Sequence, residues 1–327
     1  MWLLFLTISC ALSLSSINAD TASLRAKFSE LKLVALFPGD SSYNKSAAPF
    51  NRRFTFNPAA IVFLNDTQAV ADSVKLAAGE NLPVSARSGE HSYAAYGLGG
   101  KDGALVVDLS RLNTVSVDRS TGTAHIGSRN RLGDLAIGLN AQAKRAIPHG
   151  ICGFVGIGGH AAFGGLQELN APWPLSSSGF DFTSEHQTFY AKSITTPGGS
   201  GLPISNASIQ AFSEYVNWFV EFELYGGANS AVTAVPKDAT AFCTKINLLY
   251  TYSLNDVPLF PEAGFIFLDQ TVASIVDNNA SNWAYGAYSN HVDDRLSADQ
   301  WNYQRLTQVK SKYDPTNVFS FPQSITE

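Results

Sequence analysis

The chain contains little cysteine, little methionine and no concentration of basic residues. Its 327 residues include 3 Cys and 1 Met, and 15% of them are charged. The formal net charge is −5. Proteins that bind nucleic acid usually carry a positive patch, so we set that class of partner aside. Hydrophobic residues make up 45% of the chain, which is enough for a substantial core that we expect to be divided between two lobes.

Long hydrophobic runs are also lacking. Residues 2–15 form a short apolar run, and small residues follow it as far as Ala19. This pattern is typical of a secretory signal peptide cleaved after Ala19, and we expect a secreted protein. A membrane anchor is the alternative, but a span needs about 20 apolar residues. Four acceptor sequons agree with a secreted glycoprotein: Asn44, Asn65, Asn206 and Asn279.

Cysteine is too scarce for a disulfide framework. Once Cys10 has left with the signal peptide, the chain keeps Cys152 and Cys243. Cys152 lies in a glycine-rich loop, where a free thiol in an oxidising compartment needs a chemical reason to stay unpaired. Two other interpretations are open, a bridge between Cys152 and Cys243 and a buried, inert thiol.

The sequence does contain glycine-rich loops. The stretch Pro83–Gly100 begins as an apolar strand and turns into a loop. Small residues let backbone NH groups approach an anion, Arg87 adds charge, and His91 supplies a nucleophilic imidazole that the loop can hold against a bound ring. A purely structural turn has a similar pattern. The residues expected to bind a cofactor here are Arg87, Ser88, Gly89, His91 and Ser92.

A second loop of this kind spans Pro148–Gly165. Two such loops in one chain favour a cofactor site over two unrelated turns. The candidate cofactor-binding residues of this loop are Cys152, Gly156, Gly158, Gly159, His160 and Gly164.

Together with Asp102–Asp108, these loops resemble the flavin-binding domain of the vanillyl-alcohol oxidase superfamily, in particular its berberine-bridge-enzyme-like, glucooligosaccharide-oxidase-like branch. The resemblance covers Pro38–Gly165 and resumes at the C-terminus. In that branch, a His of the first loop and a Cys of the second loop bond covalently to the isoalloxazine ring. The resemblance therefore implies an FAD cofactor attached through His91 and Cys152, and no metal ion.

Two positions depart from the pattern of the branch. Glu90 stands where a second glycine is usual, and Arg129 stands where another glycine is expected. If the glycine at the Arg129 position served a positive φ or a close backbone approach, the arginine would strain or block the site.

Hydrophobic periodicity predicts a small α/β unit around the two loops. Helical spacing covers Asp20–Ala35, and the sequence Asn-Asp-Thr-Gln at residues 65–68 predicts the start of a second helix. The expected strands are Ala59–Leu64, Leu82–Ala86, Leu105–Leu109, Thr114–Asp118 and Thr123–Gly127, and a further helix is expected over Leu132–Ala143.

The resemblance stops after Gly165, where the second half of the family's flavin domain is missing. It resumes at His186, with strands expected over Phe219–Tyr225 and Lys245–Tyr252 and a helix over Gln300–Lys312. The expected fold class is α+β, with a shortened flavin-binding α/β lobe of the vanillyl-alcohol oxidase type and an antiparallel-sheet substrate lobe with helices. The expected boundaries are signal peptide 1–19, flavin domain 20–165, junction 166–185, substrate domain 186–290 and C-terminal segment 291–327.

The C-terminal segment carries the candidate catalytic residues. The branch typically has Tyr-x-Asn-Tyr-x-Asp here, and this chain has Tyr288-Ser-Asn-His291-Val-Asp. The resemblance implies that Tyr288 or His291 removes a proton from a substrate hydroxyl. Histidine is the easier base, because its unperturbed pKa is about 6.5 against about 10 for tyrosine.

The resemblance implies a secreted FAD-dependent oxidase of an alcohol or of a sugar hydroxyl, with oxygen as the acceptor and hydrogen peroxide as a product. The missing segment favours an alternative, a non-catalytic or incompletely assembled relative with impaired flavin binding. A lectin-like role is a third possibility, based on the alternating side chains of Leu248, Tyr250 and Tyr252, which are explained more simply as core.

Overall fold

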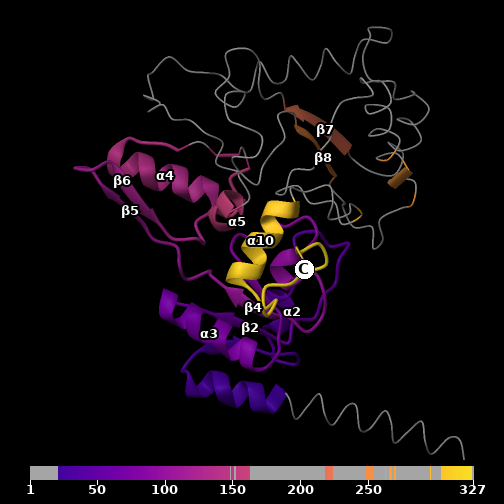
Figure 1. Ribbon diagram of the computed structural model, residues 1–327. Helices are drawn as coiled ribbons and strands as arrows, with labels where there is room; N and C mark the ends of the chain where they lie inside the picture. Colours follow the sequence, from indigo (N-terminus) through magenta and orange to yellow (C-terminus); the bar gives the residue numbers. More distant parts are fainter. Residues whose placement is uncertain are drawn as a thin grey trace, which may run out of the picture. The chain divides into compact units, whose positions relative to one another are not determined.

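The computed structural model describes residues 21–147, 149–150, 152–162, 218–223, 247–252 and 303–325, with isolated positions at 262, 265, 266, 269 and 295. The chain divides into two compact units (Figure 1). The first consists of Met1–Asn170, Thr240–Phe242 and Ser289–Glu327, and the second of Ala171–Ala239 and Cys243–Tyr288. Each unit is described by itself.

A four-stranded sheet organises the first unit. Its spatial order is β1 (Val34–Leu36), β2 (Ala60–Phe63), β4 (Leu105–Asp108) and β3 (Val84–Arg87). The pairs β2–β4 and β3–β4 are parallel, whereas β1 is antiparallel to β2. Because β3 and β4 are parallel and in register, their carboxyl ends, Arg87 and Asp108, lie opposite each other. The loop that follows β3 therefore starts at this edge of the sheet.

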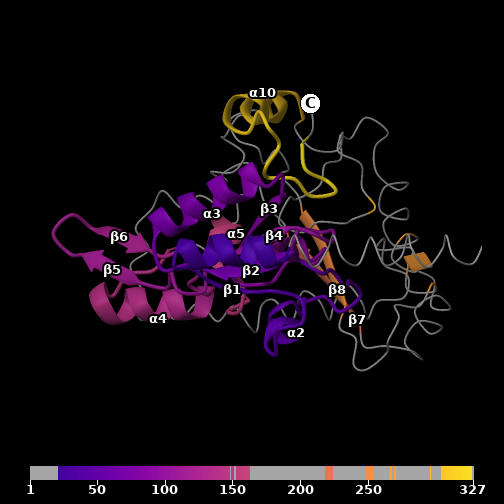
Figure 2. The same ribbon diagram turned by 90° about the horizontal axis from the view of Figure 1, so that it is seen from below.

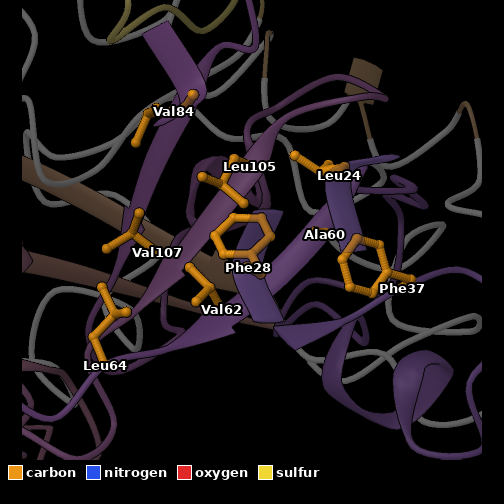
Figure 3. Close-up of a cluster of buried hydrophobic side chains, with 10 residues drawn as sticks. Leu24, Phe28, Phe37, Ala60, Val62, Leu64, Val84, Leu105 and Val107 are labelled. Atoms are coloured by element: carbon orange, nitrogen blue, oxygen red, sulfur yellow. The ribbon is translucent and has the colours of Figure 1, made fainter. Parts of the chain in front are cut away.

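The strands bury side chains on both faces, as in most parallel sheets. Phe28, from a helix over residues 21–30, lies against Val62 and Leu105 on one face (Figure 3). Ile61 and Val106 point to the other face, where Tyr43 of the short helix α2 (Tyr43–Ser46) and Leu98 of the 3-10 turn η1 (Tyr96–Leu98) are also buried. This alternation follows from the two-residue period of a strand.

Helix α3 (Thr67–Gly79) connects β2 to β3 and begins where the capping pattern predicts. The Asp66 carboxylate accepts a hydrogen bond from the Ala69 amide at 2.8 Å, which satisfies one of the helix's free NH groups. Ala77 is fully buried in the same core as Phe28. The prediction of a strand, helix and strand unit is confirmed.

The prediction of one helix over Asp20–Ala35 is wrong at its end. The helical residues stop at 30, Lys32 has a left-handed backbone with φ 55°, and β1 follows. Val34–Leu36 pairs with β2, so a tertiary contact overrides the local helical spacing.

A hairpin and a helix complete the part of the unit that precedes the second loop. The predicted strands appear as β5 (Val115–Asp118) and β6 (Thr123–Ile126), which pair antiparallel, and the predicted helix is α4 (Leu132–Ala143). Figure 2 shows α4 lying along the hairpin. Four buried side chains make this core: Leu132, Leu135, Leu139 and Ile157. Ile157 begins the short helix α5 (Ile157–Ala162), so the second loop is attached to this core.

The C-terminal segment lies against β3. Helix α10 (Tyr303–Tyr313) is followed by residues that reach the edge of the sheet, where the Val84 amide donates a hydrogen bond to the Val318 carbonyl at 2.8 Å. The Tyr96 hydroxyl donates to Gln323 at 2.8 Å, and its ring lies 4.7 Å from that of Phe321. The end of the chain thus covers the open edge of β3 and the start of the first loop.

In the second unit the structure describes one strand pair. Strands β7 (Trp218–Glu223) and β8 (Asn247–Tyr252) are antiparallel, with Trp218 opposite Tyr252. Both expected strands are therefore present, with shifted ends. Within the described residues, no helix is long and apolar enough to cross a membrane.

Candidate flavin site

The two residues expected to carry the cofactor lie side by side. The Nε2 atom of His91 is 3.6 Å from the Sγ atom of Cys152, although 61 positions separate them in the sequence. His91 comes from the loop after β3, and Cys152 from the loop before α5. Two nucleophilic side chains on separate loops therefore face the same place.

The His91 ring is fixed by an aromatic neighbour. The Phe50 ring stacks on it, with centroids 3.9 Å apart and planes at 25°. Burial lowers the pKa of His91, and the positive charge of Arg131 acts in the same direction. At neutral pH the imidazole is therefore mainly uncharged, so one ring nitrogen keeps a free lone pair.

Cys152 is a free, half-buried thiol. The interpretation as one half of a disulfide bridge is therefore wrong in this structure, and Cys243 lies outside the described residues. A free thiol beside an imidazole is a nucleophile that can be activated by loss of its proton.

Glycines bring the two loops into backbone contact. A Cβ atom on Gly89 would lie 2.2 Å from the amide nitrogen of Gly156, and a Cβ on Gly156 would lie 2.3 Å from the Ser88 hydroxyl oxygen. A Cβ on Gly158 would lie 2.8 Å from the Ser128 carbonyl oxygen, to which the Ser88 hydroxyl donates a hydrogen bond at 2.6 Å. Any larger residue at these glycines would separate the loops and, with them, His91 from Cys152.

Two other candidates, Ser92 and His160, serve the shape of the loops. The Ser92 hydroxyl accepts a hydrogen bond from the Tyr96 amide at 3.0 Å, and His160 Nε2 accepts one from the Gly150 amide at 3.1 Å. Gly159 has open space where a Cβ would be. The remaining candidates, Gly164, Tyr288 and His291, lie outside the described residues.

Arg87 is committed to a buried ion pair. Its guanidinium lies 2.6 Å from the Asp108 carboxylate, both side chains are 7% exposed, and it also donates to the Ser46 carbonyl. Arg87 thus ties the first loop to β4 and α2, and its charge is already compensated inside the protein.

Of the two departures from the glycine pattern, one is strained and the other is not. Glu90 has φ 56°, and both of its carboxylate oxygens are buried without a hydrogen-bond partner, 3.3 Å from Arg87 Nε at the nearest. Burial raises the pKa of Glu90. Arg129 is absent from the positive-φ residues, and its amide donates to the Leu112 carbonyl at 3.0 Å. Arg129 therefore does not have a positive φ, whereas Glu90 does.

The sequence analysis missed three residues of the site. Asp108 was noted only as the last residue of the stretch Asp102–Asp108. A charged residue at the end of an apolar strand could have indicated a buried ion pair, which it forms with Arg87. Phe50 and Ser128 lie outside both glycine-rich loops, and only the fold brings them to His91 and Ser88.

The arrangement fits a covalently held flavin. An imidazole and a thiol on facing loops, 3.6 Å apart, are two nucleophiles that one bound ring could meet. The described residues contain no group of three or more His, Cys, Asp or Glu side chains placed to hold a metal ion.

Two family models match this chain. The model described as FAD binding domain matches residues 58–169, and the one described as berberine and berberine like matches residues 287–326. The two matches fall on either side of the region where the resemblance is interrupted.

Curated and solved relatives match almost the whole chain. The xylooligosaccharide oxidase of Thermothelomyces thermophilus is 26% identical over 497 aligned positions, which take in 99% of each chain. Because this chain has 327 residues, a large part of that relative has no counterpart here. A solved chitooligosaccharide oxidase superposes with a TM-score of 0.73, at 20% identity, over 93% of this chain and 99% of that one.

One further solved relative bears on the cofactor. A structure of the glucooligosaccharide oxidase of Acremonium strictum, with 6-S-cysteinyl, 8α-N1-histidyl FAD in its description, has a TM-score of 0.70 and 22% identity. It covers 93% of this chain and 99% of that chain. In that protein, one FAD is bonded to a cysteine and a histidine.

Proposed function

Because the chain is a berberine-bridge-enzyme-like FAD-linked oxidoreductase, we propose that it is an oxidase that holds FAD covalently through His91 and Cys152 and oxidises a sugar hydroxyl with oxygen. The observation that supports the covalent attachment is the 3.6 Å approach of His91 Nε2 to Cys152 Sγ. Carbohydrate is the substrate class named for several relatives, including the xylooligosaccharide and chitooligosaccharide oxidases.

The protein's own groups have two tasks in this reaction. The two loops hold the ring at His91 and Cys152, and a base removes the hydroxyl proton of the sugar. When bound, FAD supplies hydride acceptance and electron transfer to oxygen. We assign the base to Tyr288 or His291, from their positions in the C-terminal segment. If His291 is the base, His291→Phe should abolish the acid limb of the pH–rate profile, whereas an unmoved profile would assign the task elsewhere.

The expected cell compartment is part of the same proposal. The apolar run at residues 2–15 and the sequons favour a secreted glycoprotein. Asn44 and Asn65 are exposed in the structure, so both are accessible to a glycosylating enzyme. The expected partners are a small carbohydrate or alcohol substrate and oxygen.

A second candidate function is a relative with impaired flavin binding. Glu90 places a strained, buried carboxylate next to His91, and a large part of the full-length relatives is missing. FAD carries a negatively charged diphosphate, so an extra acidic group in the cofactor loop opposes its binding.

The test is to denature the purified protein in acid, wash the pellet and record the visible spectrum of the polypeptide. We expect the flavin absorbance to stay with the wild type and with each single variant, His91→Ala and Cys152→Ala, and to be lost in the double variant. Peroxide formation is then measured with a panel of oligosaccharides. A colourless wild-type protein, or one that releases free flavin, would overturn the covalent proposal and favour the second candidate.

A further inference from the structure

The geometry of the His91–Cys152 pair shows which ring nitrogen of His91 can accept the proton of the Cys152 thiol. The stacked Phe50 ring holds the imidazole so that Nε2, and no other described ring nitrogen, meets the Cys152 sulfur at 3.6 Å. A sulfur–nitrogen distance of this size permits a hydrogen bond from the thiol to an acceptor nitrogen.

His91 is in the state that such a contact requires. The His91 side chain is half-buried, and both its burial and the positive charge of Arg131 disfavour a positive charge on the imidazole ring. An uncharged imidazole has one acceptor nitrogen, and an acceptor beside a thiol is a local base. With Nε2 as the acceptor, Nδ1 carries the hydrogen of the uncharged imidazole.

We propose that His91 is also the base that activates Cys152, with Nε2 taking the thiol proton. This inference rests on the proposed covalent function. The imidazole then speeds the formation of the thioether, which still forms, more slowly, in a variant that lacks it. Phe50 is a positioning residue, since it fixes the ring without contacting the sulfur in any described interaction.

The thioether step balances with oxygen as the oxidant. The sulfur forms a bond to a flavin ring carbon, and the thiol proton goes to His91 Nε2. The hydrogen on that carbon is lost as a proton and two electrons. Oxygen accepts the two electrons and two protons in all, which gives one hydrogen peroxide for each thioether formed.

The experiment uses the full chain isolated without flavin from a riboflavin-depleted host. The rate at which iodoacetamide alkylates Cys152 is followed by peptide mass spectrometry from about pH 5 to about pH 9, across the usual thiol pKa of about 8.5. The same chain unfolded in urea gives the reference rate, and peptide analysis separates Cys152 from Cys243.

At about pH 6.5 we expect folded Cys152 to react about 10-fold faster than in urea, because a thiol that passes its proton to a neighbouring imidazole attacks as the thiolate. His91→Asn should remove this excess, and Phe50→Leu should reduce it. His125→Asn, at an exposed position of β6, is the matched control and should keep it.

A folded wild-type protein whose Cys152 reacts at the rate found in urea at every pH would overturn the inference, whatever the variants do. An unchanged excess in His91→Asn would also overturn it. If His91→Asn does not fold by circular dichroism, the wild-type protein decides, since the pair predicts faster alkylation of folded than of unfolded Cys152 at about pH 6.5. No flavin enters this measurement, so a chain that fails to bind FAD can still pass it.

Discussion

Val84 in β3 and Val318 near the C-terminus are joined by a backbone hydrogen bond of 2.8 Å. Val318 also packs against the core that contains Phe28 and Leu105. Since β3 is the last strand of the sheet, this contact covers an edge that would otherwise expose free NH and CO groups. The residues after α10 therefore stabilise the strand that leads into the His91 loop.

The first prediction concerns this contact. Val318→Asp should lower the free energy of unfolding by about 1–3 kcal/mol, because a charged group would replace a partly buried apolar one. Val309 in α10 is 46% exposed, so Val309→Asp is the matched control and should change stability by about 0.5 kcal/mol or less. Urea unfolding followed by circular dichroism measures both. Equal losses in the two variants would show that Val318 does not hold the edge.

The second prediction concerns the approach of the two loops. Gly156→Ala places a methyl group where the Gly89 amide and the Ser88 hydroxyl already lie, so the loops must separate. We expect a loss of about 1–3 kcal/mol in stability, and little flavin left on the acid-washed polypeptide.

Gly159→Ala is the control for that substitution, because its methyl group meets nothing within 4 Å. Gly159 lies inside α5, where alanine is favoured over glycine by about 1 kcal/mol. The free energy of unfolding of Gly159→Ala should therefore be equal to or higher than that of the wild type. Flavin retention that is the same in both variants would mean that the loop contact does not position the two attachment residues.

The third prediction concerns the buried ion pair. Asp108→Asn removes the nearer of the two carboxylates beside the buried Arg87 guanidinium, leaving Glu90 at 3.3 Å, and should cost about 3 kcal/mol. Glu80 and Lys27 form a comparable pair with side chains 33% and 39% exposed. Glu80→Gln should therefore cost less than about 1 kcal/mol. Thermal unfolding of the two variants checks the difference, and a small effect of Asp108→Asn would place the Arg87 charge in solvent.

The fourth prediction concerns pH. Because burial raises the pKa of Glu90 in the folded protein, the folded state holds its proton more tightly than the unfolded state does. The contribution of Glu90 to the free energy of unfolding is therefore most favourable below the pKa of about 4.3 that it has in the unfolded chain. This contribution is lost as the pH rises through the pKa of the folded state. The nearby charges of Arg87 and Arg129 reduce the shift, and that of Asp108 adds to it.

Glu90→Gln removes this ionisation and should be more stable than the wild type near neutral pH, by on the order of 1–3 kcal/mol, with the gain shrinking in acid. Glu30 is exposed, and Glu30→Gln is the control, which should change stability near neutral pH by about 0.5 kcal/mol or less. The measurement is the unfolding free energy across the acid range. A difference between Glu90→Gln and wild type that does not change with pH would contradict a raised pKa.

Local patterns in the sequence were sufficient for most of the elements around the loops. The Asp66 cap, the apolar run of β4 and the periodicity over Leu132–Ala143 each carry their own physical cause, because capping, burial and side-chain period act within a few residues. The pair His91 and Cys152 was also found from the sequence, through the resemblance of two glycine-rich loops to a family of flavoproteins.

Tertiary structure decided what depends on distant partners. Val34–Leu36 became a strand because β2 offered a free edge, and no local pattern contains that information. Arg87 was predicted to face an anion, yet the parallel register places it opposite Asp108, where it forms a buried ion pair. Glu90 looked like a simple departure from a glycine pattern, but its left-handed backbone and buried carboxylate appear only in the fold.

The sequence by itself thus determined most of the local elements, the cofactor family and the two residues that we propose for the attachment. Only the tertiary structure decided that His91 presents Nε2 to Cys152, and that Phe50 holds the ring in that position. The physical reason is that a side chain's type fixes what chemistry it can do. Which atom of a side chain faces which neighbour depends on packing between segments that are far apart in the chain.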